Sequence, residues 1–155
     1  FFAVPYITNG FTILDGEVTA IDAGITEAFK YELRADANIQ TSDGVSDENT
    51  GVSLFTETLV VALKKQDAET NVQVNLLQQG LHYIIGVSKN GDYQLMGSLD
   101  GCRVTASNIS SGGARSDFNG YNLTFTSFSR TPSPFLDAST VTALLAIESA
   151  TNINP

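Results

Sequence analysis

One histidine and one cysteine are the residues of this chain that could supply thiol chemistry. His82 lies in an alternating apolar stretch, and Cys102 opens a later stretch that is rich in β-branched residues. A thiol becomes a nucleophile when a nearby base or positive charge lowers its pKa, so such a site requires these two residues to meet in space. A lone histidine in this context is more typical of packing than of general-base catalysis. A single cysteine also allows no internal disulfide.

Other candidate sites are an acidic cluster and a glycine-rich segment. Asp43, Asp47 and Glu48 could bind calcium, but they lack the alternating oxygen ligands and the closing glutamate of an EF-hand loop. Residues 110–114 match neither the Gly-x-Ser-x-Gly nucleophile elbow nor a phosphate-binding loop that ends in Gly-Lys-Ser/Thr. No base, nucleophile and orienting group can be named together. We therefore expect no catalytic residue, no cofactor and no metal, and we expect that the protein is not an enzyme.

The composition is that of a folded, acidic protein. Its 155 residues correspond to about one domain, with 42% hydrophobic and 16% charged residues. Eight basic and seventeen acidic residues give a net charge of −9, and residues 35–63 contain no lysine or arginine. This balance argues against binding to nucleic-acid phosphates, so the acidic stretch is either a solvated surface or one that repels polyanions. No apolar stretch approaches the roughly 20 residues that cross a bilayer, so we expect no membrane partner.

The first half of the chain predicts strands and one protrusion. Residues 11–14 and 17–21 are rich in β-branched and apolar residues and predict two short strands or one bulged strand. Residues 29–34 alternate between apolar and charged types, as in a strand with one wet face. Residues 35–51 are rich in Asp, Asn, Ser and Gly and predict a long loop or a protruding hairpin. The apolar residues 56–63 predict a central strand.

Two helices are expected. Asp67 can cap the start of one helix and Gly80 can end it. Val72, Leu76 and Gln79 share one face of this helix, and Leu77 lies near that face. This helix is expected to pack across a sheet. A second helix is predicted over residues 137–147. Its apolar face could pack on its own domain or on a neighbouring subunit.

The second half predicts paired strands. Residues 81–87 and 92–96 are joined through Asn90-Gly91, a sequence that favours a tight type I′ hairpin. Residues 102–107 and 121–126 are expected to form the last strand pair. The predicted fold is therefore mostly β with minor α, an antiparallel β-sandwich or barrel with one short packed helix, a long protruding loop and a C-terminal helix.

Residues 81–137 resemble the C-terminal half of tail-tube-like virion proteins of tailed phages, especially those of Bacteroidetes. The resemblance is carried by the expected hairpin, followed by Asp100-Gly-Cys-Arg-Val-Thr-Ala, by Asp117-Phe-Asn-Gly-Tyr-Asn-Leu-Thr-Phe-Thr and by Pro134-Phe-Leu-Asp. Arg115 and Ser116 depart from the commoner Gly-Asp-x-Asn-Gly-Tyr form. The N-terminal half matches by the order of its expected elements.

This resemblance implies a virion subunit whose sheets join into rings around a lumen and whose rings stack into a tube. It implies a single domain over residues 1–155, with an N-terminal arm of about residues 1–10 and a C-terminal extension of about residues 132–155. The implied partners are other copies, other virion proteins and genomic DNA that passes an acidic lumen without specific binding. The implied location is the virion tail, after assembly in the cytoplasm of the bacterial host. The loop that stacks the rings would contain the acidic residues Asp36, Asp43, Asp47, Glu48 and Glu57.

Two alternatives remain open at this stage. A head–tail connector, tail terminator or decoration protein of the virion would share the fold but form one ring or bind at a fixed site. A β-sandwich adhesion or glycan-binding module would need an exposed aromatic platform. The best candidates for that platform alternate like core residues: Tyr83, Tyr93 and Tyr121.

Overall fold

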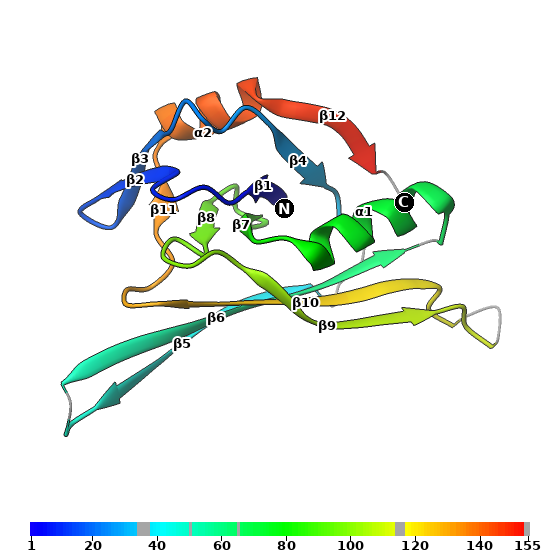
Figure 1. The fold of residues 1–155 in the computed structure, drawn as a ribbon, viewed down its shortest axis with the longest axis horizontal. Coiled ribbons are helices and arrows are strands. Elements are labelled where there is room, and N and C mark those ends of the chain that lie inside the picture. The colour runs from blue at the N-terminus through cyan, green and yellow to red at the C-terminus, as the bar shows by residue number, and fades with distance from the viewer. Residues whose placement is uncertain (34–37, 50, 65, 114–116, 154–155) are drawn as a thin grey trace.

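The computed structural model describes residues 1–33, 38–49, 51–64, 66–113 and 117–153. Within these residues the protein is 51% strand and 15% helix, arranged as two sheets with two helices. Figure 1 shows the two sheets as separate layers. The mostly β class with minor helix is confirmed, and neither sheet closes on itself.

The larger sheet has eight strands in the order β12-β4-β1-β7-β8-β11-β3-β2. Most neighbouring strands are antiparallel, but β11 pairs with β3 and β12 pairs with β4 in parallel, so this sheet is mixed. Its strands are β1 (Phe2–Pro5), β2 (Phe11–Leu14), β3 (Glu17–Ile21), β4 (Ala28–Tyr31), β7 (His82–Val87), β8 (Tyr93–Met96), β11 (Phe135–Leu136) and β12 (Glu148–Ile153).

The smaller sheet has four strands in the order β5-β6-β10-β9, all antiparallel to their neighbours. The strands are β5 (Ile39–Asp47), β6 (Val52–Lys64), β9 (Arg103–Ser110) and β10 (Gly120–Ser129). The predicted central strand corresponds to β6, and the predicted last strand pair corresponds to β9 and β10. Of the two readings for residues 35–51, the described residues adopt the hairpin, because β5 pairs with β6 along its whole length.

The segment expected as an N-terminal arm is part of the core. β1 lies between β4 and β7, and Phe2, Ala3 and Val4 are buried. Its apolar side chains alternate between the two faces of the larger sheet, so this strand is covered on both sides. The expected C-terminal extension likewise holds β11, α2 (Ala138–Ala146) and β12, which complete the larger sheet and its cover.

Helix α1 (Ala68–Gln79) has the predicted ends but packs through another face. The carboxylate of Asp67 accepts a hydrogen bond from Thr70 N at 2.7 Å, which caps the first turn. Val74 and Leu77 are buried against the smaller sheet, whereas Val72 and Leu76 are 59% and 54% exposed. The face expected to pack is therefore the solvent face.

Helix α2 packs on its own domain. Asp137 caps its first turn by accepting from Thr140 N at 2.7 Å. The Thr140 side chain and then this N–H hold the pKa of the Asp137 carboxyl below its usual range. Leu144 is fully buried in a cluster with Phe2 of β1, on the face of the larger sheet that points away from the smaller sheet. Figure 1 shows α2 on this outer side.

The turn between β7 and β8 differs from the sequence prediction, whereas the two short strands predicted over residues 11–21 are present as β2 and β3. β7 and β8 pair as expected, but Ser88 N donates to Asp92 O at 2.9 Å across a loop of several residues. In that loop Gly91 has a positive φ and Asn90 does not, so the turn is not type I′. Positive φ at two successive turn residues occurs instead at Asp15 and Gly16, between β2 and β3.

Candidate functional site

His82 and Cys102, the pair that thiol chemistry would require, lie opposite each other. Cys102 N donates to His82 O at 2.7 Å, and His82 N donates to Cys102 O at 3.1 Å. The Cys102 side chain is fully buried, and burial raises the pKa of its thiol to about 12. Burial lowers the pKa of His82, whose Nδ1 has no hydrogen-bond partner among the described residues. The thiol is protonated at neutral pH and shielded from solvent. We therefore interpret Cys102 and His82 as residues that pack in the interior.

The acidic residues assigned to the assembly loop lie at different depths. Asp43 and Asp47 are exposed on β5, and Glu48 is exposed in the turn that joins β5 to β6. Asp47 Oδ1 accepts a hydrogen bond from Asn49 N at 2.8 Å and so helps to shape this turn. Asp36 lies outside the described residues. Among the residues that are described, no group of three His, Cys, Asp or Glu side chains is placed to hold a metal ion.

Glu57 lies inside the molecule, with a relative exposure of 0%. Its Oε2 accepts hydrogen bonds from Ser127 Oγ at 2.7 Å and from Gly97 N at 3.0 Å, and its Oε1 accepts one from Ser133 Oγ at 2.7 Å. These donors replace the water that a buried carboxylate loses. They belong to β10, to the turn after β8 and to the segment before β11. Glu57 therefore ties the root of the β5–β6 hairpin to the larger sheet.

Beyond this root the hairpin leaves the body of the molecule (Figure 1). β10 pairs with β6 only from Phe55 onward, so the remaining part is two-stranded. We call residues 45–49 and 51–54 the hairpin tip. Its apolar side chains Val45, Val52 and Leu54 are 68%, 56% and 42% exposed, and Val45 lies opposite Leu54. Apolar groups gathered on an extended hairpin are typical of a surface that another protein covers.

The outer face of the smaller sheet is also uncovered. Figure 1 shows no described helix or strand beneath it. Its charged side chains are Asp43 and Asp47 on β5, Lys64 at the end of β6 and Arg103 on β9, as the strand pairing places them on this face. The other outward residues are uncharged. The polar ones include Thr41, Thr56, Thr58, Asn108, Asn122, Thr124 and Thr126, and the apolar ones include Val60, Ala62, Ile39 and Phe128, of which the last two are 57% and 50% exposed.

Both edges of this sheet are open. Within the described chain, β5 pairs only with β6, and β9 pairs only with β10. Each edge therefore presents main-chain groups that another strand can pair with, although Ser110 O at the end of β9 already accepts a hydrogen bond from Gln66 Nε2 at 2.7 Å. Arg103, in β9, is exposed and forms no ion pair with any residue that the structure describes.

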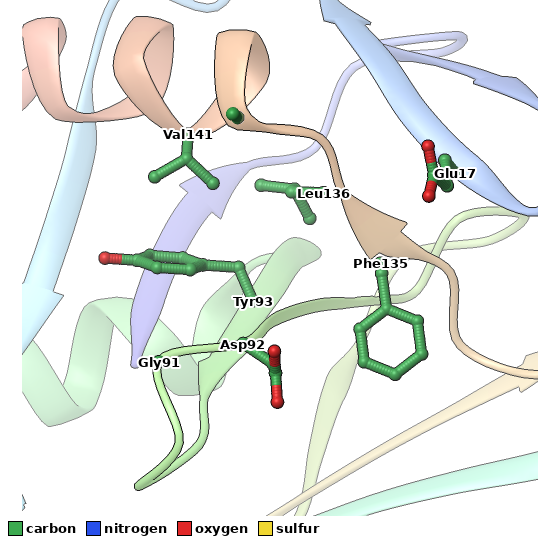
Figure 2. A pocket seen from close by; sticks show the side chains of 8 residues that line it. Glu17, Gly91, Asp92, Tyr93, Phe135, Leu136 and Val141 are labelled. Atoms are coloured by element: carbon green, nitrogen blue, oxygen red, sulfur yellow. The ribbon is translucent and has the colours of Figure 1, made fainter.

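A pocket of about 540 Å³ lies at the other side of the molecule, on the larger sheet. Figure 2 shows Tyr93, Leu136 and Val141 converging around it, while Phe135 and the carboxylate of Asp92 point away from that cluster. Its described lining contains no His, Cys, Ser, Lys or Arg, and its ionisable groups are the carboxylates of Glu17 and Asp92 and the phenol of Tyr93. The other tyrosines considered for an aromatic platform, Tyr83 and Tyr121, are buried.

The fold is a two-sheet protein in which both sheets end in unpaired strands among the described residues. The outer side of the larger sheet is packed by α2, whereas the outer face of the smaller sheet is uncovered. Comparisons with protein-family models, curated proteins and solved structures found no match. In the described part of the chain, neither helix has the length and apolar character that a membrane span requires.

Proposed function

We propose that this protein is a structural subunit of a phage virion, a tail tube or tail-tube-like protein with no catalytic role. The observation that carries the proposal is the smaller sheet, with its two open edges, bare outer face and projecting hairpin. A fold that left these surfaces in water would expose unpaired strand edges, which proteins normally protect. Pairing with further copies of the chain protects them. The resemblance of residues 81–137 to tail-tube-like proteins supports the same assignment.

In this proposal the smaller sheets of successive copies join into a ring. Each copy offers β5 at one edge and β9 at the other, so the contact joins two different surfaces and repeats from copy to copy. Such head-to-tail contacts close into rings when the rotation between copies allows it. The hairpin tip then extends beyond the smaller sheet of its own copy and buries its exposed apolar side chains against neighbouring copies.

The outer face of the smaller sheet would line the lumen. On this face Lys64 and Arg103 are balanced by Asp43 and Asp47, and the face also carries hydroxyl and amide groups. Such a face suits the sliding of DNA, because retention on phosphates requires an excess of Lys or Arg to replace counterions. The net charge of −9 adds a general repulsion for DNA. Partners would be other copies, other virion proteins at the ends of the tube and DNA in transit. The protein would reside in the virion tail after assembly in the host cytoplasm.

Two alternatives make different use of the same molecule. A head–tail connector, tail terminator or decoration protein would use the open edges to form one ring or to bind at a fixed site. An adhesion or glycan-binding module would instead use the pocket around Tyr93, which Leu136 and Val141 also line and where Glu17 supplies a carboxylate.

The proposal is tested by negative-stain electron microscopy of the purified protein, combined with light-scattering mass at several concentrations. Stacked rings or open-ended tubes are expected above a threshold concentration. Single rings that never stack would favour the connector or terminator. A monomer at every concentration, with binding to a glycan array that is lost in Tyr93→Ala, would overturn the proposal in favour of the binding module.

A further inference from the structure

The two open edges of the smaller sheet run in opposite directions. β5, β6, β10 and β9 are each antiparallel to the next strand, so β5 and β9 are antiparallel across the four-stranded sheet. A second copy related by rotation about a ring axis keeps its β5 in the direction of the first copy's β5. Its β5 therefore meets the first copy's β9 as an antiparallel neighbour, and the alternation of strand directions continues through the contact.

The edges also carry opposite charges on the same face. Arg103 pairs with Thr126 of β10, which pairs with Thr58 of β6 and through it with Thr41 of β5. Directly paired residues point to the same face of a sheet, so Arg103 points outward together with Thr41. Asp47 lies an even number of positions from Thr41 on β5 and points outward as well.

We propose that β9 of one copy pairs with β5 of the next in the register that sets Arg103 opposite Asp47. This register pairs nearly the whole of both strands and keeps every outward residue on the outer face. It absorbs the bulge in β9, where Val104 and Ala106 pair with adjacent residues of β10 and leave Thr105 as the extra residue. The further pairs across the contact are Val45 with Ala106, Asp43 with Asn108 and Thr41 with Ser110.

The same register gives the strands a slope that a closed sheet requires. Within one copy Arg103 is level with Thr58 of β6, whereas Asp47 is level with Val52 of β6. Thr58 and Val52 are six residues apart on that strand. Setting them opposite each other shifts successive copies by about 20 Å along the strands, over four strand spacings of about 4.8 Å. The resulting tilt of about 45° lies at the upper end of the range found when sheets close into a ring.

This inference rests on the proposed ring, and charge reversal tests it separately. Arg103→Glu and Asp47→Arg are each expected to raise the concentration of half-assembly about tenfold, because like charges then meet in the contact. The double variant is expected to restore assembly. Asp47→Asn removes the charge but keeps an acceptor for Asn49 N. Weaker assembly of this variant would therefore result from the lost charge and not from a damaged turn. Arg130→Glu makes the same charge change on an exposed residue outside both edges and serves as the control.

Cysteine cross-linking tests the register. Oxidation of Val45→Cys combined with Ala106→Cys is expected to link neighbouring copies into covalent ladders, and Val45→Cys combined with Ser110→Cys is not. Cys102 is fully buried and stays out of the reaction. Rings that form normally in both single charge reversals, or that cross-link only through the second pair, would overturn the register and leave the ring proposal intact. Absence of any ring in the unaltered protein would overturn both.

Discussion

The two sheets of this protein contrast in how much of their surface the chain itself covers. The larger sheet is buried on both faces at β1, and α2 packs on its outer side. The smaller sheet has one buried face, and its hairpin tip extends into solvent with both faces exposed. The contrast teaches that both sheets contribute buried side chains to the core of the single copy, whereas the smaller sheet also carries surfaces that a neighbour can bury.

Removing the carboxylate that joins the sheets is expected to have the largest effect. Glu57→Ala leaves Ser127, Ser133 and Gly97 N without their acceptor in a buried site, and we expect the free energy of unfolding to fall by about 3 kcal/mol or more. Urea unfolding measures this loss. Asp43→Ala, an exposed acid on the same hairpin, should change it by less than about 0.5 kcal/mol. Equal effects of the two variants would contradict the buried role of Glu57.

Truncation in α2 tests the cover of the larger sheet. Leu144 has 0% exposure, so Leu144→Ala should lower the free energy of unfolding by about 2–4 kcal/mol through lost burial and the cavity left behind. The adjacent Leu145 is 45% exposed, and Leu145→Ala should cost less than about 1 kcal/mol. Thermal or urea unfolding of both variants measures these losses. Equal losses would contradict the packing of one face of α2 on the larger sheet.

Polar substitution of the hairpin tip tests whether its exposed apolar groups serve assembly. We expect Val45→Ser, Val52→Ser and Leu54→Ser together to change the free energy of unfolding by less than about 1 kcal/mol, because these residues are already exposed. Light scattering and electron microscopy should show weaker assembly, with fewer or no stacked rings.

The matched control for the hairpin tip is the other exposed hairpin. Ile13 and Leu14, between β2 and β3 of the larger sheet, are 41% and 63% exposed. Ile13→Ser and Leu14→Ser should leave stacking unchanged. If Ser substitutions in the two hairpins weaken assembly equally, the difference between the two sheets does not determine assembly.

The smallest expected effect is a pH dependence from His82. Burial lowers its pKa below 6.5 in the folded protein, so the unfolded chain takes up a proton first as the pH falls. The contribution of the neutral ring is present above pH 6.5 and is lost as the pH falls through the folded pKa. We expect the decline in the free energy of unfolding between pH 7 and 5 to be shallower in His82→Gln. If the free energy of unfolding declines equally with pH in the unaltered protein and in His82→Gln, a group other than His82 is responsible for the decline.

Local chemistry made part of the fold predictable. Asp67 and Gly80 mark the ends of α1 because capping depends on neighbouring residues alone. The face of α1 that packs against the sheet was not predictable in the same way, because apolar residues occur on both sides of this helix. Tertiary contacts determine that Val74 and Leu77 are buried while Val72 is exposed.

The role of Glu57 could not be predicted from the sequence. It follows an acidic stretch and therefore resembles a surface residue, but its donors Ser127 and Ser133 lie 70 and 76 residues away. Parallel pairing of β11 with β3 is equally remote in sequence. The type I′ turn was predicted from the Asn90-Gly91 pair alone. The structure instead has a longer loop closed by the hydrogen bond from Ser88 N to Asp92 O, which that pair of residues does not indicate.

Amide hydrogen exchange, measured below and above the assembly concentration, tests the central claim most directly. We expect the edge amides of β5 and β9 to become at least tenfold more protected on assembly (~10-fold corresponds to ~1.4 kcal/mol), while β2, an edge of the larger sheet, keeps its exchange rate. Assembled particles in which β5 and β9 exchange as fast as in the single copy, or in which β2 gains the protection instead, would contradict the account.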